Sequence, residues 1–109
     1  IQHIDGQGEI ALCILSDINV GKINKRDELE SLCDLAVRSL DEIIDHQKYP
    51  IIAAEISTKA RRSLGVGYIG LAHYLAKKGY KYDQKLAWRQ VDKLSEAFQF
   101  YLLKIFLNF

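Results

Sequence analysis

The residues of this chain best suited to chemistry are its two cysteines, Cys13 and Cys33, because a thiolate is both a nucleophile and a redox group. Cys33 falls on the apolar stripe of a helical pattern, which is typical of a buried structural thiol. Cys13 lies in an uncharged run from Ile10 to Ser16, which favours an unreactive structural thiol. A redox role would need a second cysteine across a sheet or barrel, and Cys33 is a poor candidate because it belongs to the helix. The residues alone leave the role of Cys13 open.

A second candidate is the segment from Gly65 to Gly70, Gly-Val-Gly-Tyr-Ile-Gly, which matches the G-x-G-x-x-G pattern of dinucleotide-binding proteins. That pattern requires a hydrophobic strand directly before the glycines and an acidic residue about 20 positions later. Residues 59–64 form no such strand, and Asp83 is better explained as a helix cap. The glycines therefore favour close backbone packing over nucleotide binding.

Arg61 and Arg62 precede this glycine segment and could hold a phosphate, since guanidinium groups match phosphate oxygens. Basic residues at the end of a helix also complement its dipole, and we favour this second interpretation. His3, His46 and His73 lie far apart, and the chain has no His-x-x-x-His or Cys-x-x-Cys spacing. No metal site is predicted.

Composition excludes several classes of partner. Fifteen Lys and Arg against fourteen Asp and Glu give a net charge of +1, and no basic stripe accompanies the aromatic residues, so neither nucleic-acid nor membrane-surface binding is indicated. The longest apolar stretch is shorter than the roughly 20 residues that cross a bilayer. Two cysteines form no disulfide framework and no signal-peptide pattern opens the chain, which favours a reducing, cytoplasmic setting.

The elements that position these residues are mainly helical. The run from Ile10 to Ser16 predicts one short buried β-strand, and because a lone strand leaves its backbone groups unpaired, its partners are expected outside these 109 residues. Residues 1–8 read as a loop. The spacing of apolar residues, caps and breakers predicts helices from Asn24 or Lys25 to His46, from Ile51 to Ala60, from about Tyr68 to Lys78 with Gly79 as the terminating residue, and from near Asp83 onward.

Both ends indicate a piece of a larger domain. The chain contains no methionine, not even at position 1, and residues 98–109 are apolar on nearly all sides, unlike a free-standing terminal helix. We therefore expect residues 1–109 to be a single, incomplete piece of one domain. The residues also allow a different hypothesis, a small helical protein-interaction module without catalytic activity whose apolar C-terminal helix binds a partner.

Several motifs keep one register over most of the chain. They are Gly8-Glu9-Ile10-Ala11-Leu12-Cys13, Leu15-Ser16, Asn19, Ile23-Asn24, Asp27-Glu28-Leu29-Glu30, Leu35-Ala36-Val37-Arg38, Tyr49-Pro50-Ile51, Arg61-Arg62-Ser63-Leu64-Gly65-Val66-Gly67, Tyr74-Leu75-Ala76-Lys77 and Tyr101-Leu102-Leu103-Lys104. Together they resemble the large (alpha, catalytic) subunit of class I ribonucleotide reductase. The resemblance implies that the chain is part of a ten-stranded α/β barrel and that the predicted strand is one of the barrel strands.

The same resemblance implies that Cys13 is one of a redox-active cysteine pair that reduces the substrate ribose and becomes a disulfide in each turnover. The other cysteine would lie on a strand that this chain lacks. The implied substrate is a ribonucleoside diphosphate and the implied reductant is thioredoxin or glutaredoxin. A metal-containing small (beta) subunit would supply a radical, and nucleotide effectors would bind elsewhere, so no cofactor is expected in this chain.

Segments that the family needs for activity are not among these residues. The family's radical cysteine lies upstream in an Asn-x-Cys-x-Glu segment, and the substrate-phosphate loops, allosteric sites and C-terminal tail cysteines are also missing. Cys33 matches no functional cysteine of the family. The isolated chain is therefore expected to be inactive.

Overall fold

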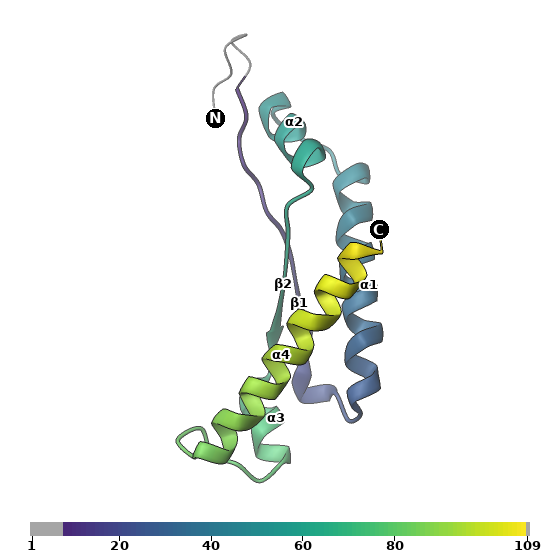
Figure 1. Cartoon of the computed structure of the whole chain (residues 1–109). Coiled ribbons are helices and arrows are strands. Elements are labelled where there is room, and N and C mark those ends of the chain that lie inside the picture. Colours follow the sequence, from purple (N-terminus) through teal and green to yellow (C-terminus); the bar gives the residue numbers. More distant parts are fainter. Residues whose placement is uncertain (1–7, 109) are drawn as a thin grey trace.

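The computed structural model of the chain describes residues 8–108. Within this range the chain forms two strands, one short 3-10 helix and four α-helices (Figure 1). In chain order these are β1 (Ile14–Asn19), η1 (Val20–Lys22), α1 (Arg26–His46), α2 (Ile52–Arg61), β2 (Leu64–Ile69), α3 (Leu71–Lys77) and α4 (Lys85–Leu107). The fold is mainly helical, as predicted. His3 and the first seven residues of the predicted loop lie outside the described residues.

The two strands pair in parallel, with Ile14 opposite Leu64 at the start of the register. The prediction that the strand has no partner within the chain is therefore wrong. Its partner is the glycine-rich segment, in which the apolar residues Leu64, Val66 and Tyr68 alternate with glycines. This spacing of two is the period of a strand, and α1 and α2 together form the crossover that a parallel pair requires.

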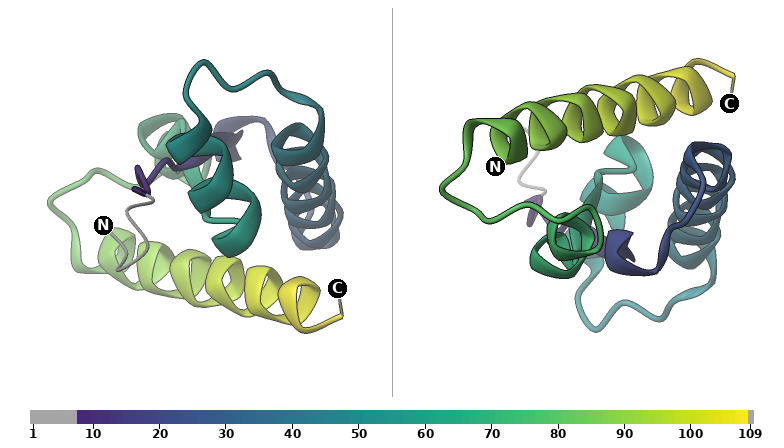
Figure 2. Two further views of the ribbon diagram at one scale, coloured as in Figure 1. Left: turned by 90° about the horizontal axis from the view of Figure 1, so that it is seen from above. Right: turned by 90° about the horizontal axis from the view of Figure 1, so that it is seen from below.

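The first strand also begins later and is more exposed than predicted. β1 starts at Ile14 rather than Ile10, because the preceding residues run beside α2: the N–H of Ile10 donates to the carbonyl of Ala53 (3.2 Å) and that of Ile14 to the carbonyl of Ser63 (3.4 Å). The side chain of Leu15 is 69% exposed. Helices cover one face of the sheet, and in the described part of the chain nothing covers the other (Figure 2).

α1 has nearly the predicted bounds. Its N-terminus is capped by Glu28, whose Oε2 accepts hydrogen bonds from the N–H groups of Asn24 (2.9 Å) and Lys25 (3.2 Å). These bonds hold the pKa of the Glu28 carboxyl below its usual value. The buried residues of the helix are Leu29, Cys33, Val37, Leu40 and Ile44. Helical spacing in the sequence also runs the apolar stripe through Leu32, Ala36 and Ile43. Ile43 is 43% exposed, so the buried stripe is rotated slightly from that expectation.

α4 lies against α1, and both helices cover the face of the sheet that carries Ile18 (Figures 1 and 2). The ring of Phe98 meets Tyr68 of β2 edge-on, with 5.4 Å between centroids, and the Tyr68 hydroxyl is 3.0 Å from Ser95 Oγ. The buried core is formed by Ile18, Val20, Leu29, Cys33, Val37, Leu94, Ala97, Phe98 and Ile105. One apolar core therefore joins β1, β2, α1 and α4.

The two short helices flank this core. α2 lies within one residue of its predicted bounds. α3 begins at Leu71 rather than Tyr68, because Tyr68 and Ile69 belong to β2. Gly79 follows α3 with a φ of +80°, so its predicted role in ending the helix is confirmed.

Candidate redox site at Cys13

Cys13 lies immediately before β1 on the uncovered side of the sheet, and its thiol is free and exposed. A Cβ placed on Gly65 would lie 3.6 Å from Cys13 Sγ and 2.8 Å from Leu15 Cδ2. Both side chains therefore extend over the backbone of Gly65. Ile18, on the opposite face, is only 6% exposed because α1 and α4 cover it.

Gly65 and Gly67 leave two positions of β2 on this face without side chains. A Cβ on Gly67 would lie 2.5 Å from Oδ1 of Asp17, so the side chains of β1 occupy the space that side chains of β2 would need. The predicted close packing of the glycine segment is confirmed. In the dinucleotide fingerprint the glycines follow a strand and form a turn. Here Gly65 and Gly67 lie inside the strand, which agrees with setting that interpretation aside.

Cys33 lies on the other side of the sheet from Cys13. It is fully buried in the core, and burial raises the pKa of its thiol to about 11. The structural role predicted for Cys33 fits this position. Since the chain contains only these two cysteines, a redox partner for Cys13 would have to come from another chain segment.

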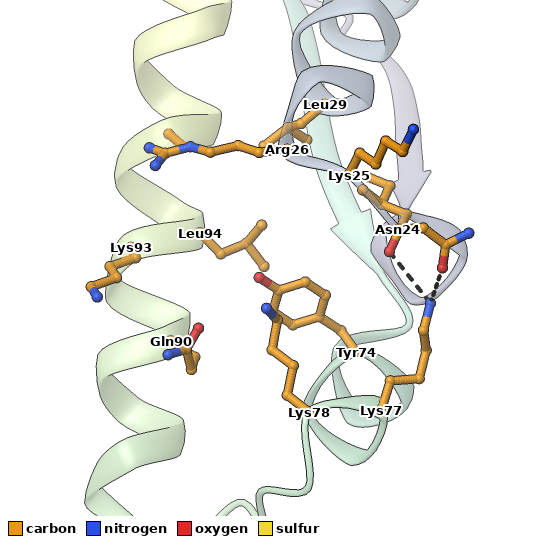
Figure 3. Close-up of a pocket in the computed structure, with 12 residues that line it drawn as sticks. Asn24, Lys25, Arg26, Leu29, Tyr74, Lys77, Lys78, Gln90, Lys93 and Leu94 are labelled. Carbon is orange, nitrogen blue, oxygen red and sulfur yellow. Dashed lines mark hydrogen bonds between the residues drawn. The ribbon is translucent and has the colours of Figure 1, made fainter.

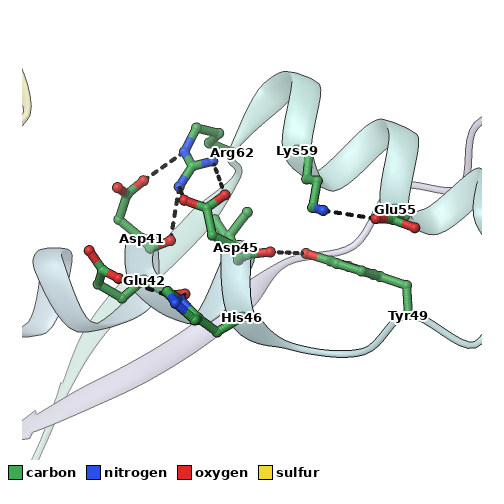
Figure 4. Close-up of polar contacts among 9 residues, drawn as sticks. Asp41, Glu42, Asp45, His46, Tyr49, Glu55, Lys59 and Arg62 are labelled. Atoms are coloured by element: carbon green, nitrogen blue, oxygen red, sulfur yellow. Dashed lines mark hydrogen bonds and ion pairs between the residues drawn. The ribbon is translucent and has the colours of Figure 1, made fainter.

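Both arginines before β2 are engaged with carboxylates. Arg61 binds Glu9 through two hydrogen bonds of 2.8 and 3.0 Å, and the Glu9 side chain is only 4% exposed. Arg62 binds Asp41 (2.7 Å) and Asp45 (2.8 and 3.1 Å) on α1, and also the carbonyl of Asp41 (Figure 4). These ion pairs occupy both guanidinium groups. They favour a structural role for Arg61 and Arg62 over phosphate binding.

The sequence interpretation missed these acidic partners. The sequence alone favours a solvated helix face for Asp41 and Asp45, and nothing in it marks Glu9 as buried. Asp41 and Asp45 are four residues apart and so lie on one side of α1, which is a usable signal for a shared basic partner. Glu9 offers no comparable signal, because its partner is 52 residues away.

A basic cleft of about 390 Å³ lies between α4 and the N-terminal end of α1, with α3 below (Figure 3). Its basic lining residues are Lys25, Arg26, Lys77, Lys78 and Lys93. Lys77 is held by the carbonyl of Gly21 (3.1 Å) and by Oδ1 of Asn24 (2.9 Å), and Lys78 Nζ lies 5.1 Å from the ring centre of Tyr74. The cleft does not include the thiol of Cys13.

Over residues 8–108, no group of three or more His, Cys, Asp and Glu side chains is placed to hold a metal ion. His46 contacts the carbonyl of Glu42 within its own helix (2.8 Å), and His73 is exposed on α3.

None of the described helices is both long enough and apolar enough to cross a membrane.

Comparison with known proteins gives one family. The family model described as the barrel domain of ribonucleotide reductase matches residues 1–107. The chain is 55% identical over 109 residues to the ribonucleoside-diphosphate reductase subunit alpha of Haemophilus influenzae, and 50% identical over 100 residues to that of Buchnera aphidicola; these alignments cover 99% and 92% of the chain. It is 34% identical over 102 residues to a vitamin B12-dependent ribonucleoside-diphosphate reductase of Mycobacterium tuberculosis, with 84% of the chain covered. The chain spans only 13% to 15% of the length of these relatives.

Proposed function

Because the chain belongs to the ribonucleotide reductase barrel-domain family, we propose that it forms part of the wall of a catalytic barrel and carries, in Cys13, one of the two thiols that reduce the ribonucleotide. In this proposal residues 1–109 are one incomplete piece of a ten-stranded α/β barrel, and β1 and β2 are two of its strands. The complete subunit converts ribonucleoside diphosphates to deoxyribonucleotides for DNA synthesis.

The exposed position of Cys13 is the observation that carries the proposal. The helices cover one face of the sheet, and the thiol lies on the other, where it extends over the backbone of Gly65. In an α/β barrel the helices lie outside and the other face of the sheet points inward. The same arrangement would place Cys13 inside the barrel, where a substrate binds.

The second thiol of the pair comes from a strand outside this chain. The two thiols give two electrons and two protons to the ribonucleotide, a C–O bond of the ribose breaks and its hydroxyl leaves as water, and a sulfur–sulfur bond forms between the two cysteines. Thioredoxin or glutaredoxin then reduces the disulfide by thiol exchange. Because a disulfide requires its two Cα atoms to lie about 4.4 to 6.8 Å apart, the partner strand must approach the uncovered face of β1 closely.

The radical that starts the reaction also comes from outside the chain. Reductases of this family generally need a radical-generating partner, and we assign this role to a metal-containing small (beta) subunit, with nucleotide effectors bound elsewhere. The relative named as vitamin B12-dependent is similar over the same region. This similarity supports the proposal that this part of the barrel wall is shared by reductases with different radical sources. The proposed location is the reducing cytoplasm.

The alternative of a small helical interaction module is not favoured. The family match covers residues 1–107, and the relatives align with both the strands and the helices.

Substitution of Cys13 by Ser in the complete subunit tests the proposal. We expect Cys13→Ser to abolish multiple turnover with a thioredoxin-type reductant, because no disulfide can form, while the fold is retained. Turnover is measured as deoxyribonucleotide formed per subunit over time. Sustained turnover by the Cys13→Ser subunit would contradict the assignment.

The matched control is Cys33→Ala, which removes the other thiol of the chain. Because Cys33 is buried in the core behind the sheet, this variant loses stability but is expected to keep multiple turnover at a temperature where it stays folded. Loss of turnover in the folded Cys33→Ala subunit would mean that the assay does not distinguish the thiol of Cys13 from a buried structural thiol.

A further inference from the structure

We propose that the adjacent residues Arg61 and Arg62 are positioning residues that together fix the Cys13 thiol beside Gly65. The inference rests on the proposed role of Cys13. The two guanidinium groups bind carboxylates on different parts of the fold: Arg61 binds Glu9, four residues before Cys13, and Arg62 binds α1. A single dipeptide thus connects the residues that lead into β1 with the long helix behind the sheet.

The Arg61 contact anchors the chain ahead of the thiol. Ala54, Ser57 and Thr58 form the buried face of α2, and Arg61 follows on the same side of the helix with its side chain 46% exposed. Its guanidinium makes a two-pronged pair with Glu9, whose carboxylate is almost fully buried. A buried carboxylate that loses its cation is strongly disfavoured, so this pair gives the lead-in segment one defined position along α2.

The Arg62 contact anchors the chain beside the thiol. Arg62 ends α2 in a left-handed conformation (φ 48°, ψ 45°), which a non-glycine residue adopts only when its surroundings hold it there. Its side chain spans Asp41 and Asp45 and also binds a carbonyl of α1 (Figure 4). The next residue, Ser63, accepts the hydrogen bond from the N–H of Ile14, the residue after Cys13.

The two anchors therefore bracket Cys13 along the chain. Glu9 fixes the side before it, and the bond from Ile14 to Ser63 fixes the side after it. Ser63 is also only two residues before Gly65, above which the thiol lies. Formation of a disulfide tolerates little displacement of the sulfur, so a thiol that must repeatedly meet a partner cysteine benefits from being held at both sides.

An engineered cysteine at Gly65 measures the position of the thiol directly. The Cβ position of residue 65 lies 3.6 Å from Cys13 Sγ, within reach of a disulfide, and the exposed Leu15 side chain can move aside. In the full 109-residue chain carrying Gly65→Cys, the equilibrium between dithiol and disulfide is titrated against reduced and oxidised glutathione. This equilibrium gives the effective concentration of one thiol at the other, and it requires no reductase activity.

We expect Glu9→Gln and Arg62→Gln, each added to the Gly65→Cys chain, to lower this effective concentration several-fold. The control is Asp34→Asn, which removes a carboxylate from the exposed Asp34–Arg38 pair on α1 and should leave the value unchanged. Labelling of the buried Cys33 with a thiol reagent reports whether each variant is folded. Where Arg62→Gln exposes Cys33, Arg62→Lys is used instead, because it keeps the charge and loses the two-pronged contact.

An unchanged effective concentration in variants that still protect Cys33 would overturn the proposal. So would failure of the Gly65→Cys chain to form the disulfide, since the thiol would then not be fixed beside residue 65. A drop that occurs only together with exposure of Cys33 would also overturn it, because the arginines would then act on the fold as a whole. The two proposals can fail separately. If the Gly65→Cys variants behave as expected but the complete subunit keeps its turnover after Cys13→Ser, this inference stands and only the proposed function is refuted.

Discussion

Gly70 lies directly against the side chain of Asn19, and this contact joins the ends of the two strands. Oδ1 of Asn19 accepts a hydrogen bond from the N–H of Gly21 (3.1 Å), and a Cβ on Gly70 would overlap that same oxygen. Gly70 also has a φ of +79°, a conformation that side chains disfavour. The junction between β2 and α3 therefore requires glycine for two independent reasons.

Comparison of Gly70→Ala with Gly79→Ala separates these two reasons. Gly79 has nearly the same φ, +80°, but an added Cβ there would meet nothing within 4 Å. Gly79→Ala should cost about 1 to 2 kcal/mol of unfolding free energy from backbone strain alone. Gly70→Ala should cost at least about 1 kcal/mol more, because Asn19 must also move. Urea unfolding of both variants measures the difference, and equal losses would show that the contact with Asn19 is unimportant.

Cys33 makes the chain less stable at alkaline pH. Burial raises the pKa of this thiol from 9.0 to about 11, so between these values the unfolded chain loses a proton that the folded chain keeps. The stability that the neutral thiol contributes is fully present below pH 9 and is lost as the pH rises toward 11, by roughly 3 kcal/mol in total. We expect the difference in unfolding free energy between the natural chain and Cys33→Ala to shrink over this range. A difference that stays constant with pH would contradict the assignment.

Asp45 gives the opposite dependence at acid pH. Its hydrogen bonds with Arg62 hold the pKa of this carboxyl below its usual 3.8. The pair therefore stabilises the fold above about pH 4, and this contribution disappears as the pH falls through the lowered pKa of the folded state. Denaturant unfolding between pH 2 and 6 should show that Asp45→Asn costs less as the pH falls. In a chain that also carries Arg62→Gln, the cost of Asp45→Asn should no longer depend on pH. If it still does, a group other than Arg62 causes the pH dependence.

Two phenylalanines of α4 provide a matched test of the core. Phe98 is 6% exposed and packs edge-on against Tyr68, whereas Phe100 is 60% exposed on the same helix. Phe98→Ala should cost about 3 to 5 kcal/mol and Phe100→Ala less than about 1 kcal/mol, as measured by chemical denaturation. A large loss for Phe100→Ala in the isolated chain would mean that its exposed side chain packs in solution.

The helices could be predicted from the sequence because their burial depends on neighbours three and four residues away. The pattern from Leu29 to Ile43 identified α1 almost completely, and the position of Gly79 identified the end of α3. Such contacts join residues that are close in the sequence, so a short stretch of chain is enough to predict them. Which side of the strand is exposed could not be predicted in this way, because Ile18 is covered and Leu15 is left open by α1 and α4, whose residues are distant in the sequence.

The second strand was missed although the signal was present. Leu64, Val66 and Tyr68 occupy every second position, with Gly65 and Gly67 between them, and this period of two is typical of a strand. The buried position of Glu9 is a different case. It depends on Arg61, which the fold brings near only after α1 and α2 have crossed behind the sheet. Only a three-dimensional structure can reveal such a pair.

The parallel pairing of β1 with β2 also sets an order of events while the chain is being synthesised. α1 is built from local contacts and can form soon after its residues leave the ribosome. β1 must wait for residues 64–69, because its partner is translated only after the whole crossover. During this interval the edge of β1 that β2 will occupy is unpaired, so the nascent chain is open to mispairing until translation of β2 is complete.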